Sequence, residues 1–413
     1  MIMKKTFLAF IPIIGMMFAS CDLSTGPDEP PRPTIDYVEV PTQMKKIIAK
    51  SNDVSWQMLC KSLKEGENVL LSPYSLNVAL AMAWNGADGE TAEQICKFIG
   101  IDFDDYSNDD INHALQLTTN YLCNADPVTI FTSANSLWLS NKFQPKETFT
   151  KTLNDWYDAK SFTVDFTNPS VVNNVNDWCK EQTKGLIPDM YSKIDPGTTL
   201  ILLNAIYFKS AWEKKFDKSA TKTGDFTLSN GTKVQPNFMN RVSKENAFDG
   251  SSMTMVMLPM GEKKRYYTFF ALPKKGKTLA DAANGVKEAL QKYPANWEST
   301  EMNMSIPKFQ IKNNNKLDTM LQDMGLTLPF DPKASNFSKM TDLGAYISEL
   351  RQACTFSLNE DEVEASAATG ASFYLTSNFS SGMNFHLDRP FLFGLYEVNT
   401  GTLLFVGAVE NPC

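Results

Sequence analysis

Histidine is scarce in this sequence, and no catalytic motif is visible. Among 413 residues, only His113 and His386 are histidines. Neither lies in a nucleophile–base motif such as G-x-S-x-G. The sequence therefore argues against an enzyme and against a bound cofactor, and we predict structural roles for both histidines.

Closely spaced cysteine pairs are also missing. The seven cysteines include no C-x-x-C pair and no cluster with histidine, which argues against a zinc site or a redox motif. Cys21 belongs to the N-terminal segment described below. The other six are expected to behave mostly as small buried apolar residues, with any disulfide pairing left open: Cys60, Cys96, Cys123, Cys179, Cys354 and Cys413.

Clusters of positive charge are absent as well. The formal net charge is −8, and no group of lysines and arginines stands out. We therefore predict that the protein binds neither nucleic acid nor heparin-like polyanions. Long apolar runs are absent after residue 21, so no helix that crosses a bilayer is expected.

The N-terminal segment is typical of a bacterial lipoprotein signal at residues 1–20. Lys4 and Lys5 precede an apolar stretch, and Phe18-Ala-Ser-Cys21 is similar to a lipobox, whose cysteine is lipidated. The alternative is a plain secretory signal that happens to end near a cysteine. Residues 21–44 are rich in proline and acid, which predicts an extended tether. The folded domain is expected at residues 45–413, exported and anchored to the outer membrane, in the periplasm or at the surface.

Apolar periodicity gives a coarse outline of the domain. Residues 44–63 have helical spacing and predict one helix or two, and a further helix is expected at 171–184. Strands are expected at 131–140, 199–208 and 346–358. Ser72 and Ser75 flank Pro73 and Tyr74, a pattern that predicts a helix start at which serine caps the free N–H groups.

The most informative stretch is residues 359–375, which begins with acidic residues and then alternates like a strand. Every second residue is apolar or small, whereas most of the residues between could face water: Val363, Ala365, Ala367, Thr369, Ala371, Phe373 and Leu375. Small side chains on one face would let such a segment enter between existing strands without overpacking them. On periodicity alone, an ordinary strand with a polar tail remains open.

Several motifs of this sequence resemble motifs of the serpin family of serine protease inhibitors, and they occur in the same order as in that family. Residues 359–369 are similar to the proximal hinge of the family, and residues 386–394 and 403–412 to its C-terminal strands. Further matches lie upstream, at residues 68–75, 79–82, 86–91, 203–212, 269–273 and 306–309. The resemblance covers roughly residues 45–412. It implies a single α+β domain with three β-sheets, about eight or nine helices and an exposed reactive-centre loop.

The resemblance also implies two groups of functional residues. One is the mobile hinge, in which Glu362 stands where the family usually has glycine and could slow insertion: Glu360, Glu362, Val363, Glu364, Ala365, Ser366, Ala367, Ala368 and Thr369. The other is a hydrogen-bonded cluster below the point at which the sheet opens, in which Gln352 stands where the family usually has histidine: Ser72, Ser75, Asn204 and Gln352. Some members carry a basic helix for polyanions, but the corresponding residues 102–110 are acidic here.

Counting from the hinge, the family pattern implies cleavage between Thr376 and Ser377. Tyr374, Leu375 and Phe379 are alternatives, because the spacing to Pro390 is slightly long. No lysine or arginine occurs in residues 363–388, which argues against trypsin-like targets.

The resemblance therefore implies covalent trapping of elastase-, subtilisin- or chymotrypsin-like serine proteases by a monomer, with papain-like cysteine proteases as a further group of targets. One alternative is a non-inhibitory serpin that acts as a binding or substrate-like surface module. Another is a ligand-binding lipoprotein that uses Trp138, Trp156, Trp178 and Trp212 as stacking platforms, although core packing is the better interpretation for Trp178 and Trp212.

Overall fold

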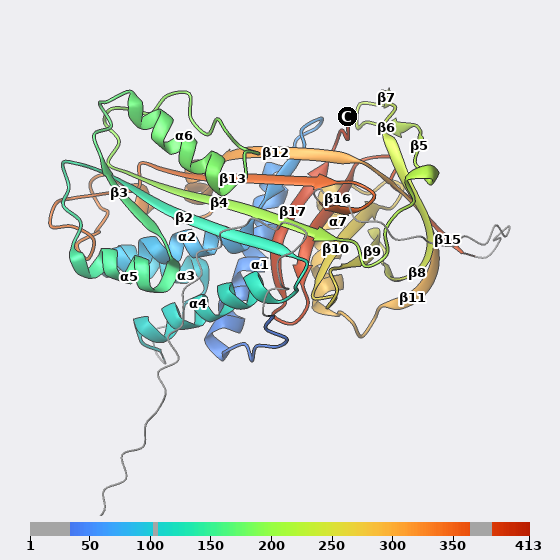
Figure 1. The fold of residues 1–413 in the computed structure, drawn as a ribbon, viewed down its shortest axis with the longest axis horizontal. Helices are drawn as coiled ribbons and strands as arrows, with labels where there is room; N and C mark the ends of the chain where they lie inside the picture. The colour runs from blue at the N-terminus through green and yellow to red at the C-terminus, as the bar shows by residue number, and fades with distance from the viewer. Residues whose placement is uncertain (1–33, 102–105, 364–381) are drawn as a thin grey trace, which may run out of the picture. The chain divides into compact units, whose positions relative to one another are not determined.

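Two large β-sheets organise the part of the chain that the structure, a computed structural model, describes: residues 34–101, 106–363 and 382–413 (Figure 1). The smaller of the two has six strands in the order β12-β13-β4-β2-β3, with β14 beside β4. Its strands are β2 (Ile130–Ser140), β3 (Lys160–Val164), β4 (Leu200–Ala211), β12 (Phe309–Lys316), β13 (Glu349–Leu358) and β14 (Glu362–Val363).

The larger sheet has nine strands in the order β1-β17-β16-β10-β9-β8-β11-β15, with β5 beside β8. These strands are β1 (Val69–Leu71), β5 (Lys222–Thr223), β8 (Asn237–Asp249), β9 (Met253–Met260), β10 (Tyr266–Pro273), β11 (Glu298–Pro307), β15 (Met383–His386), β16 (Phe391–Glu397) and β17 (Thr402–Val409). A two-stranded sheet pairs β6 (Phe226–Thr227) with β7 (Lys233–Val234).

Eight α-helices and two 3₁₀ turns complete the described residues. The helices are α1 (Thr42–Ser62), α2 (Pro73–Gly86), α3 (Gly89–Ile99), α4 (Asn108–Asn124), α5 (Glu147–Tyr157), α6 (Ser170–Gln182), α7 (Leu279–Gln291) and α8 (Asp318–Asp323). The 3₁₀ turns are Lys218–Ala220 and Leu328–Phe330. The expected α+β fold with three sheets is confirmed, and the segment expected as one helix or two is the single helix α1.

Local sequence explains several helix starts. Ser107 before α4 and Thr278 before α7 each form a capping box with the aspartate three residues later. At α2 the expectation was wrong, because the Ser72 hydroxyl makes no capping bond. It donates to the carbonyl of Leu404 at 2.7 Å instead, and Pro73 supplies the preorganised first turn.

The core lies on both faces of the six-stranded sheet. On β4, even-numbered residues such as Leu202 and Ile206 face the main core, which the nine-stranded sheet and helices α1 and α2 share. Odd-numbered residues such as Leu203 face a smaller cluster with Trp178 of α6. Trp138 and Trp212 are buried as well, so three of the four tryptophans considered as stacking platforms are core residues.

The N-terminal part of the described chain packs on the domain before residue 45. The Ile35 amide donates to the carbonyl of Asn124 at 2.9 Å, and the side chains of Val40 and Met44 are buried. Residues 35–44, which the sequence assigned to the tether, therefore belong to the folded domain. The predicted signal segment, Cys21 and the rest of the tether to residue 33 lie outside the described residues.

The scarce residue types occupy unremarkable places. Cys96, Cys179 and Cys354 are buried and unpaired, Cys60 and Cys123 are partly buried, and Cys413 is exposed. Both histidines are exposed, and each ring lies beside an aromatic side chain, Trp156 for His113 and Phe238 for His386. Within the described ranges, no helix combines the length and apolarity that crossing a membrane requires.

Candidate functional site

The candidate site is the seam between β4 and β13 in the six-stranded sheet. The two strands run parallel, with Ile201–Ile206 opposite Glu349–Cys354. Beyond Cys354, β13 continues to pair with β12 but no longer pairs with β4. The seam is therefore open at the end where both strands finish.

β14 occupies the open end of this seam. It runs antiparallel to β4, with Val363 opposite Ser210 and Glu362 opposite Ala211. β14 also contacts β13, so it lies on the β13 side of β4. The side chain of Val363 is only 1% exposed and belongs to the main core. Antiparallel pairing with β4 has therefore already begun at Val363, the last described residue before the gap at residues 364–381.

A tight turn at Asn359 reverses the chain between β13 and β14. The Asn359 side-chain oxygen accepts hydrogen bonds from the amides of Asp361 at 2.9 Å and Glu362 at 3.1 Å. The Asn359 amide donates to the Glu362 carbonyl at 3.1 Å. This is an Asx turn, which asparagine forms readily. Glu362 has no positive φ, so the turn does not require glycine there.

Backbone contacts hold this hinge segment, residues 359–363, against the chain that follows β4. The Trp212 indole donates to the Asn359 carbonyl at 2.9 Å. The Phe216 amide donates to the Glu360 carbonyl at 2.9 Å, and the Trp212 amide to the Asp361 carbonyl at 3.4 Å. Because these bonds use the main chain, they fix the path of the hinge segment without depending on its side chains.

The hinge segment has three acidic residues, the hinge acids Glu360, Asp361 and Glu362. Each of them pairs with at least one lysine. Lys308 Nζ lies 3.0 Å from Glu360 Oε2, and the Thr221 hydroxyl donates to the same carboxylate at 2.7 Å. Burial alone would raise the pKa of Glu360, but these two hydrogen bonds, a backbone hydrogen bond and the charge of Lys308 together hold the pKa below its usual value. Glu360 is therefore ionised at neutral pH.

The other two acids have separate lysine partners. Asp361 pairs with Lys218 and, at 3.7 Å, with Lys215. The hydrogen bond from Lys218 lowers the pKa of Asp361, and the same contact raises the pKa of Lys218. Glu362, which is 6% exposed, lies 3.9 Å from Lys209 Nζ on β4.

Beneath the seam, Gln352 joins β13 to the start of α2. Its Oε1 accepts from the Ser72 amide at 2.9 Å, and its Nε2 donates to the Ser72 carbonyl at 2.6 Å. Nε2 also lies 3.4 Å from the Ser75 hydroxyl. Three of the four residues expected in this cluster are thus directly connected, since the glutamine both donates and accepts.

Asn204, the fourth, belongs to a row of amides that crosses the sheet. Asn135, Asn204, Gln352 and Asn315 are register partners on β2, β4, β13 and β12. The Asn204 amide donates to Asn135 Oδ1 at 2.8 Å rather than to the serines, and Asn315 donates to the Leu70 carbonyl at 2.8 Å. In the described residues, Asn204 Oδ1 is buried without a hydrogen-bond partner. The row therefore keeps one spare acceptor at the seam.

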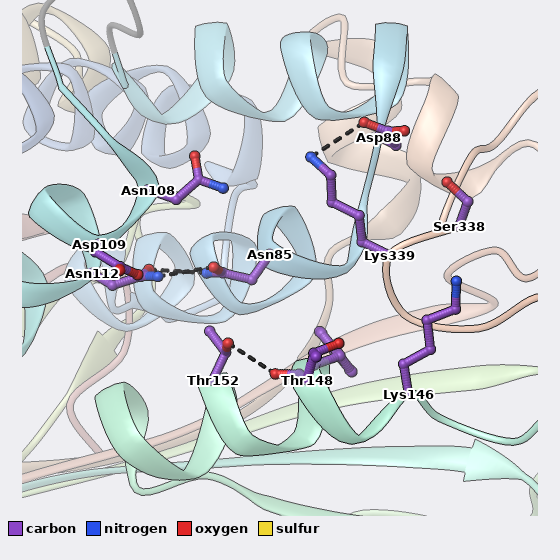
Figure 2. A pocket seen from close by; sticks show the side chains of 11 residues that line it. Asn85, Asp88, Asn108, Asp109, Asn112, Lys146, Thr148, Thr152, Ser338 and Lys339 are labelled. Atoms are coloured by element: carbon purple, nitrogen blue, oxygen red, sulfur yellow. Dashed lines mark hydrogen bonds and ion pairs between the residues drawn. The ribbon is translucent and has the colours of Figure 1, made fainter.

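A cavity of about 510 Å³ lies elsewhere, among α2, α4, α5 and the loop at Ser338 and Lys339 (Figure 2). Both lysines that line it have carboxylate partners: Lys339 lies 3.2 Å from Asp88, and Lys146 lies 2.7 Å from Asp342. None of its lining residues belongs to the seam or the hinge segment. The described residues contain no group of histidine, cysteine or carboxylate side chains suited to a metal ion.

The structure describes only part of the predicted hinge and none of the predicted cleavage site. Glu360, Glu362 and Val363 lie as above. Glu364 to Thr369 and the candidate bond residues lie outside the described residues: Tyr374, Leu375, Thr376, Ser377 and Phe379. Residues 364–381 join β14 of one large sheet to β15 of the other.

Sequence reasoning missed several residues of this region, and four of them show why. Lys209, Asn135 and Asn315 acquire their roles from contacts with other strands, and Asn359 acquires its role from the turn that it forms. For Asn359 a signal was available, because an asparagine two residues before a backbone reversal is typical of an Asx turn. For the other three, only the strand register reveals the contact.

Comparison with known proteins assigns this architecture to a family. The family model "Serpin (serine protease inhibitor)" matches residues 49–412. Serpin-ZXA of Oryza sativa subsp. japonica is 33% identical over 367 residues, which are 84% of this chain and 91% of that protein.

Solved structures give the same result. The thermophilic serpin tengpin in the native state has a TM-score of 0.81 at 27% identity, over 92% of this chain and 97% of that chain. Human thyroxine-binding globulin has a TM-score of 0.82 at 23% identity, over 90% of this chain and 100% of that chain, which shows the shared fold alone. With its family model matched almost from α1 to the C-terminus, the chain belongs to the serpin family.

Proposed function

We propose that this serpin inhibits serine proteases by covalent trapping, with its cleaved loop entering the seam between β4 and β13. The observation that carries the proposal is β14, which pairs antiparallel with β4 at the open end of a parallel seam. Antiparallel pairing is slightly more stable per residue than parallel pairing. A strand that enters here would replace the parallel pair with an antiparallel pair on each side.

The register of β14 assigns a partner to each entering residue. If pairing continues from Val363 opposite Ser210, residues 365, 367 and 369 come opposite Phe208, Ile206 and Asn204. Directly opposite side chains share a face of the sheet, so these positions would then face the main core, to which Phe208 and Ile206 belong. Ala365, Ala367 and Thr369 are small enough for that face, and the Thr369 hydroxyl would reach the row at the spare acceptor of Asn204. Glu364 would come opposite Lys209 on the other face.

The trapping chemistry follows from ordinary acyl transfer. The protease serine oxygen attacks the carbonyl carbon of Thr376, and the bond to the nitrogen of Ser377 breaks. The serine proton passes through the base of the protease to that nitrogen, which leaves as a free amine, and the loop becomes an ester of the enzyme. Insertion of the newly freed strand would carry the esterified protease away from its place of attack before water cleaves the ester.

The expected targets are proteases with apolar specificity pockets. Residues 373–379 offer aromatic, branched and small side chains, and no cation occurs from 363 to 388. Apolar pockets separate such residues by only about 1–3 kcal/mol per methylene, so neighbouring bonds can serve different enzymes. Elastase-, subtilisin- and chymotrypsin-like enzymes are the proposed targets, with papain-like cysteine proteases as a further group.

The test is to mix the full-length protein with elastase, chymotrypsin, subtilisin, papain and trypsin and to look for adducts on denaturing gels. We expect adducts with the first three and none with trypsin. Mass spectrometry of the released C-terminal peptide should show a start at Ser377 or within residues 374–380. Trapping of trypsin alone, or release from outside this range, would contradict the assignment.

A non-inhibitory role is the second candidate, favoured by the fold shared with thyroxine-binding globulin. Such a protein would be cut in the loop without forming an adduct and without gaining a strand. Bulky or charged side chains at 365, 367 or 369 would have suited this role, whereas the chain has alanine, alanine and threonine.

The proposed location is the outer membrane, through a lipid on Cys21. The supporting observation is the sequence Phe18-Ala-Ser-Cys21 followed by proline-rich residues. Several acyl chains on one cysteine bind a bilayer stably, at about 0.8 kcal/mol per buried methylene. Wild-type protein should fractionate with membranes, and the Cys21→Ser variant should be soluble or unprocessed. Wild-type protein found wholly in the soluble fraction would remove the anchor.

A further inference from the structure

We infer that Lys209, through its contact with Glu362, is a positioning residue that sets the register at which the loop enters the sheet. The inference rests on the proposed trapping function and adds to it a contact between two side chains, of which the motifs singled out only Glu362. Lys209 belongs to β4 itself, and Glu362 to the first residue pair of β14. The pair therefore joins the receiving strand to the entering one.

The geometry places both side chains on the same face of the sheet. Glu362 is directly opposite Ala211, and Lys209 lies two residues before Ala211 on β4, which makes it the diagonal neighbour of Glu362. The distance from Lys209 Nζ to Glu362 Oε2 is 3.9 Å. The lysine side chain is 20% exposed and that of the glutamate 8%, so the contact is shielded from water. Removing one member of a shielded ion pair is destabilising.

The other hinge acids cannot set this register. Glu360 pairs with Lys308, between β11 and β12, and Asp361 with Lys215 and Lys218, beyond the end of β4. These contacts hold the turn against its surroundings. Of the lysines paired with hinge acids in the described residues, Lys209 alone lies on the strand that receives the loop.

Register matters because a slip of one residue turns every side chain to the opposite face. In the observed register Val363 is buried in the main core opposite Ser210. A slip would expose Val363 and separate Glu362 from Lys209. The apolar contact and the ionic contact therefore select the same register, from opposite faces of one strand.

The departure from the family pattern at Glu362 has a different consequence from the one its sequence suggests. The Asn359 turn does not need a glycine at 362, and the carboxylate supplies a contact that glycine could not. We therefore expect Glu362 to help start insertion in the correct register, and its effect on the rate of insertion stays a prediction.

The test compares Lys209→Met with the matched control Lys218→Met. Lys218 also pairs with a hinge acid, but its side chain is 67% exposed, and exposed pairs contribute little. The first measurement is hydrogen exchange of a peptide covering residues 359–363 in the uncut protein. We expect exchange about tenfold faster in Lys209→Met and close to wild type in Lys218→Met.

The second measurement is the number of inhibitor molecules consumed per protease trapped, with the rate of loop cleavage measured separately. Lys209→Met should raise that number several-fold and leave the cleavage rate unchanged, whereas Lys209→Arg and the double variant Lys209→Glu with Glu362→Lys should restore it. If Lys209→Met acted only by lowering overall stability, the charge exchange would not restore trapping.

The two measurements separate failure of this inference from failure of the proposed function. If wild-type protein forms no adduct, the trapping proposal fails. The hydrogen-exchange data alone then decide whether the contact between Lys209 and Glu362 holds residues 359–363 in place. If wild type traps protease and Lys209→Met traps it with the same stoichiometry and exchange, the positioning role is overturned.

Discussion

The two large sheets join their strands in different ways. In the nine-stranded sheet, β9, β10, β16 and β17 form an unbroken antiparallel series whose aromatic residues, such as Phe269, Phe393 and Phe405, are fully buried. In the six-stranded sheet, β4 and β13 meet in a short parallel seam crossed by buried amides. Both sheets pack against apolar cores, but the seam also has buried amide side chains beside it, whose hydrogen bonds to the start of α2 and to β2 can find new partners.

The difference suggests which part of the molecule stays fixed and which part opens. Apolar packing fits one arrangement closely, and parting it would expose large side chains to water. Amide hydrogen bonds can be exchanged for bonds to an entering strand, which supplies donors and acceptors of its own. A seam crossed by amides is therefore suited to accept a strand, whereas the nine-stranded sheet provides the frame.

The largest effect is expected from a charge on the strand that enters the seam. Ala367→Arg would place a guanidinium opposite Ile206 in the main core, so the variant should be cleaved without trapping protease. Ser366→Arg, one residue away, would face the other side of the sheet and should retain more trapping. The measurement is the ratio of adduct to cleaved product on denaturing gels. Equal trapping by wild type and Ala367→Arg would contradict the register.

Truncation of a buried aromatic side chain in the nine-stranded sheet should lower the folding stability most. Phe393 is fully buried between β10 and β17 and lies 4.8 Å, ring to ring, from Phe356 of β13. Phe393→Ala should lower the free energy of unfolding by about 3–5 kcal/mol. Urea denaturation of intact protein measures this change, and a loss below about 1 kcal/mol would show that the frame packs loosely.

A truncation in the seam should have a smaller effect. Gln352→Ala would leave the Ser72 amide and carbonyl without their partners and should cost about 1–3 kcal/mol. Gln352→His keeps a donor and an acceptor and serves as the matched control, with stability close to wild type. If alanine and histidine behaved alike, the hydrogen bonds of the cluster would have no measurable role.

The smallest effect concerns pH, and it has opposite signs in the two regions. Burial raises the pKa of Glu397 at the end of β16, so its contribution to stability is full below its ordinary pKa and is lost as pH rises through the raised value. Hydrogen bonds lower the pKa of Asp361, so its contribution is present above its ordinary pKa and is lost as pH falls. Glu397→Gln should therefore flatten the melting temperature between pH 4 and neutrality, and Asp361→Asn should flatten it only below about pH 4.

Much of the fold could be predicted from the sequence, because the motifs and the alternation are patterns of neighbouring residues, and the order of the motifs matches a known family. The strands around the seam, the buried hinge acids and the Gln352–Ser72 contact all involve residues that the motifs single out. The Ser72 hydroxyl could not be assigned in this way, since its partner Leu404 is 332 residues away. Lys209 and the amide row depend on strand register, and the packing of residues 35–44 depends on surfaces formed by distant helices and loops.

Thermal melting of intact and loop-cleaved protein tests the central claim most directly. The protein is cut within residues 364–381 by a protease that it does not trap, and both forms are melted under the same conditions. Insertion of one more strand into the β4–β13 seam predicts that the cleaved form melts well above the intact form, and that Ala367→Arg loses this difference. Equal melting temperatures for cleaved and intact wild-type protein would contradict the account.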